Sequence, residues 1–351
     1  MSKEKKKNEY VAVGGQALME GIMMRGPKGM AMSLRLPDGT IETQMKDFVS
    51  IRKKFKPFNI PIIRGVVSFI ESMISGYKLL MESAEKTALD DMEAENESKL
   101  DKWLSDHFGP KMMAVIGFIA AVLGVGISFL LFMYLPTLLF DLTNKYIAKG
   151  AIDMWRAVFE GIIRVIIFII YMALVARMKE IRRVYMYHGA EHKTIFCFEH
   201  GKELTVDNIR EEKRFHPRCG TSFIFVTIIL SILISSIVSI AFPALTAKRW
   251  LWIITKVLML PAIMGVGFEF IQLAGKYPNK FTSLLSAPGL LMQRITTVEP
   301  TDDIIEVAIE AMKAALTGEV PVKEEKAACD CADEPAAATD FDEEPTVSSE
   351  E

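Results

Sequence analysis

Two long runs without a charged residue constrain this chain more than any other feature. One covers residues 112–140 and the other covers residues 223–247. Each run is longer than the roughly 20 apolar residues that a helix needs to cross a lipid bilayer. We therefore expect both to be membrane-spanning helices.

Two further apolar stretches have a similar length but carry charged residues. They are residues 155–178, with Glu160 and Arg164, and residues 251–274, with Lys256 and Glu269. Half of the 351 residues are hydrophobic, and the mean hydropathy of +0.24 is high for a soluble protein. We predict a mainly α-helical polytopic membrane protein with about four transmembrane helices, a small N-terminal β-hairpin element and cytoplasmic helices.

The distribution of basic residues predicts the orientation in the membrane. Lysine and arginine are frequent between residues 177 and 218, whereas the loop at 244–250 carries only Lys248 and Arg249. The positive-inside rule then places the N-terminus, this middle loop and the C-terminus in the cytoplasm, so the expected location is the cytoplasmic (inner) membrane. All four cysteines lie on the same side, where disulfides are not expected. They are Cys197, Cys219, Cys329 and Cys331.

Composition and charge divide the chain into seven segments. They are a glycine-rich and β-hairpin segment (1–58), an amphipathic and charged helical segment (59–111), a transmembrane hairpin (112–178), a cytoplasmic loop with histidine and cysteine motifs (179–222), a second transmembrane hairpin (223–274), a cytoplasmic connector and helix (275–317), and a disordered acidic tail (318–351).

Local patterns predict smaller elements within these segments. Two alternating runs flank a Pro-Asp-Gly turn at residues 37–39 and predict a hairpin. Residues 60–84 have apolar positions at helical spacing and suit an amphipathic helix on the membrane or on its neighbours. Residues 286–300 are interpreted as a loop-rich connector. A final helix is expected between an N-cap at Thr301 and a stop at Gly318.

The stretch "YHGAEHKT" contains the chemistry that most invites a functional interpretation. It places His188 and His192 four residues apart, so that on a helix both project from one face. Glu191 falls with them inside an arc of about 100°. The order H-x-x-E-H is that of inverted zinc peptidases, in which the glutamate is the base. We expect a divalent metal ion, Zn²⁺, with Glu191 as the general base.

Further ligands come from segments that meet the same membrane face. His216 and Cys219 lie in "FHPRCGTSF" before the third span, and Glu269 lies near the inner end of the fourth. A closed structural site would use His188, His192, His216 and Cys219. An open catalytic site would use three protein ligands, with Glu269 or His216 as the third.

Other interpretations of these residues need no metal. His188 and His192 are compatible with polar residues at the membrane interface, and Pro217 is compatible with His216 and Cys219 only shaping a turn. The tripeptide at residues 14–16, Gly-Gly-Gln, matches the one that release factors use, but a lone tripeptide is poor evidence and loop packing is the better explanation. Glu160 and Arg164 have the spacing of an ion pair on one helix.

Several motifs together resemble a known family. The segments "GGQALMEGIMMRGP", "YHGAEHKTI", "HPRCGTSF", "GFEFIQLAGK" and "APGLLMQRITTVEP" are similar to signature segments of the YqhQ-like bacterial membrane proteins. That family is a domain of unknown function catalogued as predicted metal-dependent enzymes. The resemblance covers about residues 11–316. It implies a polytopic membrane protein and the same site candidates: His188, Glu191, His192, His216 and Cys219.

These observations favour a metal-dependent hydrolase of the cytoplasmic membrane with its site at the inner interface. The alternative is a non-catalytic membrane assembly, insertion or transport factor with a structural metal site. The charged residues inside the spans also permit a transporter. Expected partners are the lipid bilayer and other membrane proteins. Nucleic acid is not expected as a partner, because acidic residues are interleaved with the lysine and arginine residues of the middle loop.

Overall fold

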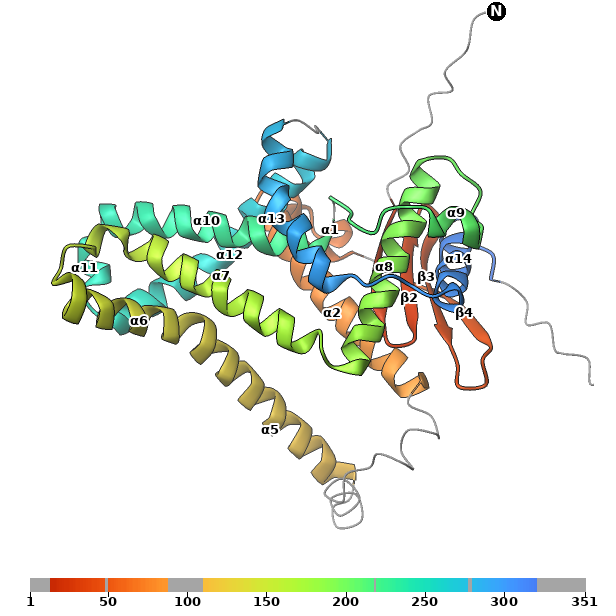
Figure 1. Ribbon diagram of the computed structural model, residues 1–351, viewed down its shortest axis with the longest axis horizontal. Helices are drawn as coiled ribbons and strands as arrows, with labels where there is room; N and C mark the ends of the chain where they lie inside the picture. The colour runs from red at the N-terminus through yellow and green to blue at the C-terminus, as the bar shows by residue number, and fades with distance from the viewer. Residues whose placement is uncertain (1–12, 48–49, 88–109, 218, 277–279, 321–351) are drawn as a thin grey trace, which may run out of the picture. The chain divides into compact units, whose positions relative to one another are not determined.

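The structure is a computed structural model that describes residues 13–47, 50–87, 110–217, 219–276 and 280–320 (Figure 1). The charged segment at 88–109 and the predicted acidic tail beyond residue 320, with Cys329 and Cys331, lie outside the described residues.

A four-stranded antiparallel sheet forms the N-terminal part. Its strands pair in chain order: β1 (Gly14–Leu18), β2 (Gly21–Gly26), β3 (Gly29–Arg35) and β4 (Ile41–Lys46). The predicted hairpin is confirmed as β3 and β4, with Gly39 at a φ of 82° in the turn. The prediction was incomplete, because the glycine-rich stretch before it forms β1 and β2. One of those glycines has a clear steric role, since a Cβ on Gly26 would lie 2.5 Å from the carbonyl oxygen of Ala315.

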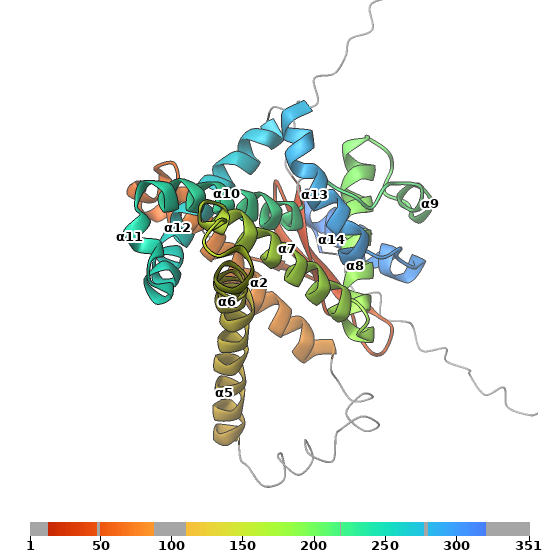
Figure 2. The same ribbon diagram turned by 60° about the vertical axis from the view of Figure 1, so that its left-hand side comes forward.

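Two helices pack against one face of this sheet and enclose a core there. α14 (Asp302–Thr317) contacts β2 and β3, and α8 (Lys179–Glu199) contacts β1 and α14 (Figure 1 and Figure 2). The predicted bounds of α14 are confirmed, because Thr301 is its N-cap residue and Gly318 ends it at a φ of 81°. Its apolar face is fully buried with side chains of the sheet and of α8. These include Ile22, Met24, Ala31, Tyr187, Ala190, Ile304, Ala308 and Met312.

In the described part of the chain, four helical segments are long and apolar enough to cross a membrane, as the sequence predicts. They are residues Ala121–Ala148, Asp153–Val175, Phe223–Ala241 and Arg249–Phe270. The first combines α5 (Pro110–Phe129), a π-helix (Leu130–Tyr134), α6 (Leu135–Thr143) and a second π-helix (Asn144–Ala148). The others are formed by η4 (Asp153–Trp155) with α7 (Arg156–Val175), by α10 (Gly220–Ala241) and by α12 (Arg249–Lys276), with α11 (Pro243–Thr246) between the last two. Their outward apolar side chains are exposed in the protein itself, as expected where lipid covers them.

The predicted amphipathic helix is present as α2 (Ile63–Thr87), which follows the short elements α1 (Ile51–Lys54) and η1 (Lys56–Asn59). It packs on α12 and on β1. Its opposite face exposes Met73, Ile74 and Tyr77. Contact of that face with the membrane surface remains a prediction.

The predicted loop-rich connector at 286–300 is wrong for most of its length. Residues up to Thr296 belong to α13 (Lys280–Thr296), which contains Pro288, and residues 297–300 form neither helix nor strand. α13 packs along α10 and buries Met292, Gln293 and Thr296. Proline removes one backbone donor from a helix, and packing against a neighbouring helix offsets that local cost.

The predicted ion pair between Glu160 and Arg164 is also corrected. The two side chains interact through their charges, but the direct partner of the Glu160 carboxylate is Lys256 of α12. Arg164 instead donates from Nε to the carbonyl oxygen of Phe132, at 3.0 Å. Helix spacing predicted a pair on one helix, whereas packing of α7 against its neighbours supplied closer partners.

Candidate metal centre

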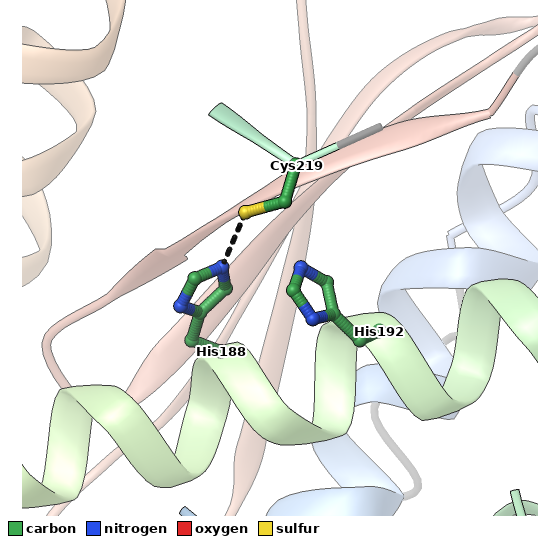
Figure 3. Close-up of side chains that lie close together, drawn as sticks. All are labelled: His188, His192 and Cys219. Carbon is green, nitrogen blue, oxygen red and sulfur yellow. Dashed lines mark hydrogen bonds between the residues drawn. The ribbon is translucent and has the colours of Figure 1, made fainter. Parts of the chain in front are cut away.

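Two histidines of α8 and one cysteine converge where α10 begins. His188 and His192 lie one turn apart on α8, and Cys219 is the N-cap residue of α10. Both rings point toward the Cys219 sulfur (Figure 3). The three potential ligand atoms all lie within 4.8 Å of one another, and Nε2 of His188 is 3.2 Å from Sγ. The structure thus unites three of the residues that the sequence marked as metal ligands.

Backbone carbonyls fix the tautomer of both imidazoles. Nδ1 of His188 donates to the carbonyl oxygen of Thr296 at 2.8 Å, and Nδ1 of His192 donates to that of Arg214 at 2.5 Å. A carbonyl oxygen only accepts, so each proton sits on Nδ1 and each Nε2 carries a lone pair. This is the arrangement that protein metal sites use to orient histidine ligands.

The second imidazole leaves its ligand atom without a partner. Nε2 of His192 is buried and makes no hydrogen bond to any described residue. His192 as a whole is only 1% exposed. An unsatisfied buried acceptor is costly, and a cation held by Nε2 and the neighbouring sulfur would remove that cost. The residues present therefore fit a metal ion.

One of the two anchoring carbonyls, that of Thr296, belongs to a segment that the sequence did not associate with the site. Gln293 of α13 exchanges two hydrogen bonds with the backbone of His216, at 2.7 and 2.8 Å. Glu299 forms ion pairs with Lys193 of α8 and with Arg214. These contacts hold the loop before α10 and the segment after α13 against α8. Backbone acceptors, and side chains such as Gln293 and Glu299 that join segments distant in sequence, have no characteristic residue spacing that would reveal them in the sequence.

A glycine inside the motif permits the close approach of one of these segments. A Cβ on Gly189 would lie 2.1 Å from the carbonyl oxygen of Val298. The amide of Val298 in turn donates to the carbonyl oxygen of Tyr185 at 2.9 Å. From the sequence, Gly189 only weakens the helix by about 1 kcal/mol. In the structure it allows the chain that carries the Thr296 carbonyl to lie against α8.

Glu191 lies on the same helix but faces the sheet. Its side chain packs against Gly15 of β1, whose N–H donates to the carboxylate. Burial raises the pKa of Glu191 to about 7, while the nearby His188 ring and the Gly15 hydrogen bond act in the opposite direction. The carboxylate is therefore poised to exchange a proton near neutral pH.

The tripeptide at residues 14–16 belongs to β1 rather than to a loop, and Gln16 donates to the carbonyl oxygen of Gly76.

His216 lies beside the cluster without joining it. Its ring centroid is 5.6 Å from that of His192 and 4.7 Å from that of Phe196. Its Nε2 is 3.6 Å from a carboxylate oxygen of Glu199. Burial, together with the nearby His192 ring, lowers the pKa of His216 to about 4. The imidazole is thus neutral at physiological pH and lines the centre.

Glu269 is not brought to the cluster, which corrects the expectation that it could be the third ligand. Its carboxylate accepts two hydrogen bonds from Arg64 of α2, at 2.6 and 2.5 Å, and a third from the amide of Ile62. This ion pair joins the amphipathic helix to the fourth span. A carboxylate neutralised by a bidentate arginine has its lone pairs engaged, so Glu269 does not belong to the ligand set.

Comparison with known proteins assigns the chain to a family. A family model described as "Protein of unknown function (DUF1385)" matches residues 60–318. The chain belongs to the DUF1385 family. It is also 34% identical over 325 residues to "Uncharacterized protein YqhQ" of Bacillus subtilis (strain 168), an alignment that covers 90% of this chain and 95% of that protein. No solved structure matches the chain.

This membership confirms the resemblance that the motifs indicated. The matched DUF1385 region includes α8, the start of α10 and the segment after α13, so it contains every residue of the cluster and its anchors. The region matched by the family model begins after the four-stranded sheet. The alignment with the Bacillus protein covers 90% of the chain and therefore extends beyond that region. Neither comparison supplies a metal or an activity. Any proposal of a metal or of an activity therefore depends on the geometry of the cluster.

Proposed function

We propose that this DUF1385 protein is a zinc-dependent hydrolase of the cytoplasmic membrane, with His188, His192 and Cys219 as the metal ligands. One observation carries the proposal: two Nε2 atoms and one thiol sulfur lie within 4.8 Å of one another, and the buried Nε2 of His192 has no partner among the described residues. Backbone carbonyls hold both rings in the tautomer that binds metal.

The donor set favours zinc among common divalent ions. Imidazole nitrogen and thiolate sulfur suit Zn²⁺, whereas Mg²⁺ and Ca²⁺ prefer oxygen ligands. Cys219 would bind as the thiolate, so its proton would leave on metal binding. A sulfur at a helix N-terminus is well placed for this, because the helix dipole stabilises the negative charge there.

Three protein ligands are the number found in catalytic zinc sites, which keep one tetrahedral position open. When bound, zinc would supply Lewis-acid activation of a water or of a substrate carbonyl or phosphoryl oxygen. Glu191 faces the sheet but lies close enough to His188 to interact with it, and it would take the proton of the attacking water and return it to the leaving group. A pKa of about 7 suits a group that must both accept and donate a proton at neutral pH.

Replacing the proposed base separates metal binding from catalysis. Glu191→Gln should keep the zinc, because the three ligands are untouched and the amide oxygen can still accept from Gly15. Hydrolysis should fall about 10²- to 10⁴-fold. The measurement is zinc content together with turnover on a panel of peptide, ester and phosphoester substrates. Glu180→Gln, at an exposed position of the same helix, is the matched control. Unchanged turnover in Glu191→Gln would remove Glu191 from this role.

A second candidate function is a structural metal clamp in a non-catalytic membrane factor. The observation that favours it is the origin of the ligands. Cys219 begins a membrane span, whereas both histidines belong to α8, which packs on the sheet. A metal ion there would join these two parts whether or not any reaction followed.

Replacing the sulfur distinguishes the two candidates. If the centre is catalytic, Cys219→Ser should weaken zinc binding by at least about tenfold while the protein stays folded, because Gln293 and Glu299 hold the same segments independently. The thiolate absorption of the cobalt-substituted protein should disappear. Cys197→Ser, at a buried cysteine of α8 outside the cluster, is the control. Cooperative unfolding that accompanies metal loss would instead favour the clamp.

The proposed orientation places the sheet, α8 and the metal centre in the cytoplasm. The support is the concentration of lysine and arginine between residues 177 and 218. α8 directly follows the second span, and Cys219 directly precedes the third, so all three ligands would lie at the inner interface. A fluorescent reporter fused to the C-terminus, compared with a periplasmic reporter at the same place, tests this orientation.

A further inference from the structure

A cavity lies among the membrane helices, at a distance from the metal centre. It has a volume of about 120 Å³ and is lined from all four spans. The lining residues are Phe132 and Met133 of the first span, Arg164 of α7, Thr227, Ile228, Ser231 and Ser235 of α10, and Lys256, Leu260 and Ile263 of α12. Thr227, the lining residue of α10 nearest to Cys219 in sequence, is eight residues beyond it, about 12 Å along a helix. The cavity is therefore a separate site.

Two residues with cationic side chains line this cavity. Lys256 is 5% exposed. It pairs with Glu160 of α7 and also donates to the hydroxyl of Thr137, at 3.2 Å. Arg164 uses Nε to bind the carbonyl oxygen of Phe132, which belongs to the π-helix of the first span. The two cations are close enough for their charges to repel each other.

One hydrogen-bond donor of these two cationic side chains has no partner among the described residues. Nη2 of Arg164 is buried and has no hydrogen-bond partner among the described residues. Glu160 accepts from Lys256 and from the indole of Trp252 with one oxygen, Oε2. Its other oxygen, Oε1, is buried and has no partner in the described part of the chain. The carboxylate thus engages Lys256 directly and Arg164 only through space.

The charges around the cavity do not cancel. One carboxylate faces one ammonium and one guanidinium, which leaves a net charge of +1 inside the apolar part of the membrane. Arginine keeps its charge in proteins, and an uncompensated charge in a low-dielectric environment is costly. Ionisable groups within membrane helices are characteristic of sites that bind or conduct polar solutes. A bound anion would neutralise the excess charge and satisfy the free Nη2.

We propose that this cavity binds a small oxyanion, a phosphate or carboxylate group, between Arg164 and Lys256. The guanidinium would donate to it from Nη2, and Ser231 and Ser235 offer hydroxyl groups from α10 on the same wall. The volume accommodates a group of this size, since a water molecule occupies about 30 Å³ of liquid. The same oxyanion chemistry occurs in a dissolved anion and in the headgroup of an anionic lipid.

Calorimetric titration of inorganic phosphate into protein purified in an uncharged, phosphate-free detergent tests the proposal. The wild-type protein should show saturable binding. Arg164→Gln should weaken it by about tenfold or more, the loss expected for a charged hydrogen bond. Glu160→Gln should strengthen it, because the competing carboxylate charge is removed. A purely structural role for these residues would not give effects of opposite sign.

Matched controls and a second arm complete the experiment. Arg182→Gln makes the same chemical change at an exposed position of α8 and should leave phosphate binding unchanged. If Arg164→Gln fails to fold, Ser231→Ala tests the same cavity and should weaken binding. Zinc content should be the same in every folded variant.

Repeating the titration with phosphatidylglycerol added to the micelles identifies the source of the oxyanion. Competition with phosphate indicates a lipid headgroup, and no competition indicates a dissolved anion. Absence of saturable binding of both phosphate and phosphatidylglycerol to the wild-type protein would overturn the proposal. Equal binding by Arg164→Gln and the wild type would overturn it as well.

Discussion

Protein purified with both His188→Ala and His192→Ala will contain about one tenth of the wild-type zinc or less. The two substitutions remove both nitrogen ligands and leave one sulfur, which is too few donors for a stable zinc site. Because the Nε2 of His192 is buried and has no partner among the described residues, its loss also removes an unsatisfied acceptor. The fold should therefore tolerate the change. Elemental analysis of detergent-purified protein provides the measurement.

Two single variants make this result specific. His200→Ala removes an imidazole next to the same helix, but His200 pairs with Glu212 and lies outside the three-residue group, so full zinc content is expected. His216→Ala should have a smaller effect than either ligand, since its Nε2 faces Glu199. Equal zinc in the double variant and the wild type would end the proposal of a metal centre at this position.

Gly189→Ala will lower the stability of the protein, although alanine is the better helix former. The exchange favours the helix by about 1 kcal/mol, but the new Cβ would lie 2.1 Å from the carbonyl oxygen of Val298. Forcing the two segments apart should cost more than this gain, at about 1–3 kcal/mol for an overpacked contact. The displaced segment also carries the Thr296 carbonyl that orients His188. Zinc affinity should therefore fall about tenfold.

Thermal unfolding in detergent and zinc competition with a chelating dye measure the two effects. Gly126→Ala is the matched control, because Gly126 is also helical and a Cβ there meets nothing within 4 Å. It should leave stability and zinc affinity unchanged or slightly raise stability. An increase in stability for Gly189→Ala would mean that the Val298 segment does not lie against α8 as described.

The location of the spans and of the last helix was predictable because both depend on local sequence. An uncharged run longer than the bilayer thickness has few alternatives to a membrane helix, and all four predicted spans are present. For α14, an N-cap at Thr301, acidic residues in the first turn and Gly318 at the end each act within one helical turn. Interactions of that range are visible in the order of the residues.

The sheet and α13 were harder to predict because their stability depends on partners. β1 and β2 are rich in glycine, which has low strand propensity, and they are held by pairing in the meander and by α8 and α14. α13 contains Pro288 and a glycine, yet it is helical where it packs along α10. Tertiary contacts override weak local preferences in both places.

The sequence by itself determined that His188 and His192 would share one face if their segment is helical, since side chains four residues apart on a helix point the same way. It also determined that this helix would lie next to a membrane span. Only the tertiary structure decided which groups meet those rings: Cys219 joins them, and Glu269 pairs with Arg64. Helical geometry sets the direction of a side chain, whereas the group it faces depends on how segments distant in the sequence pack together.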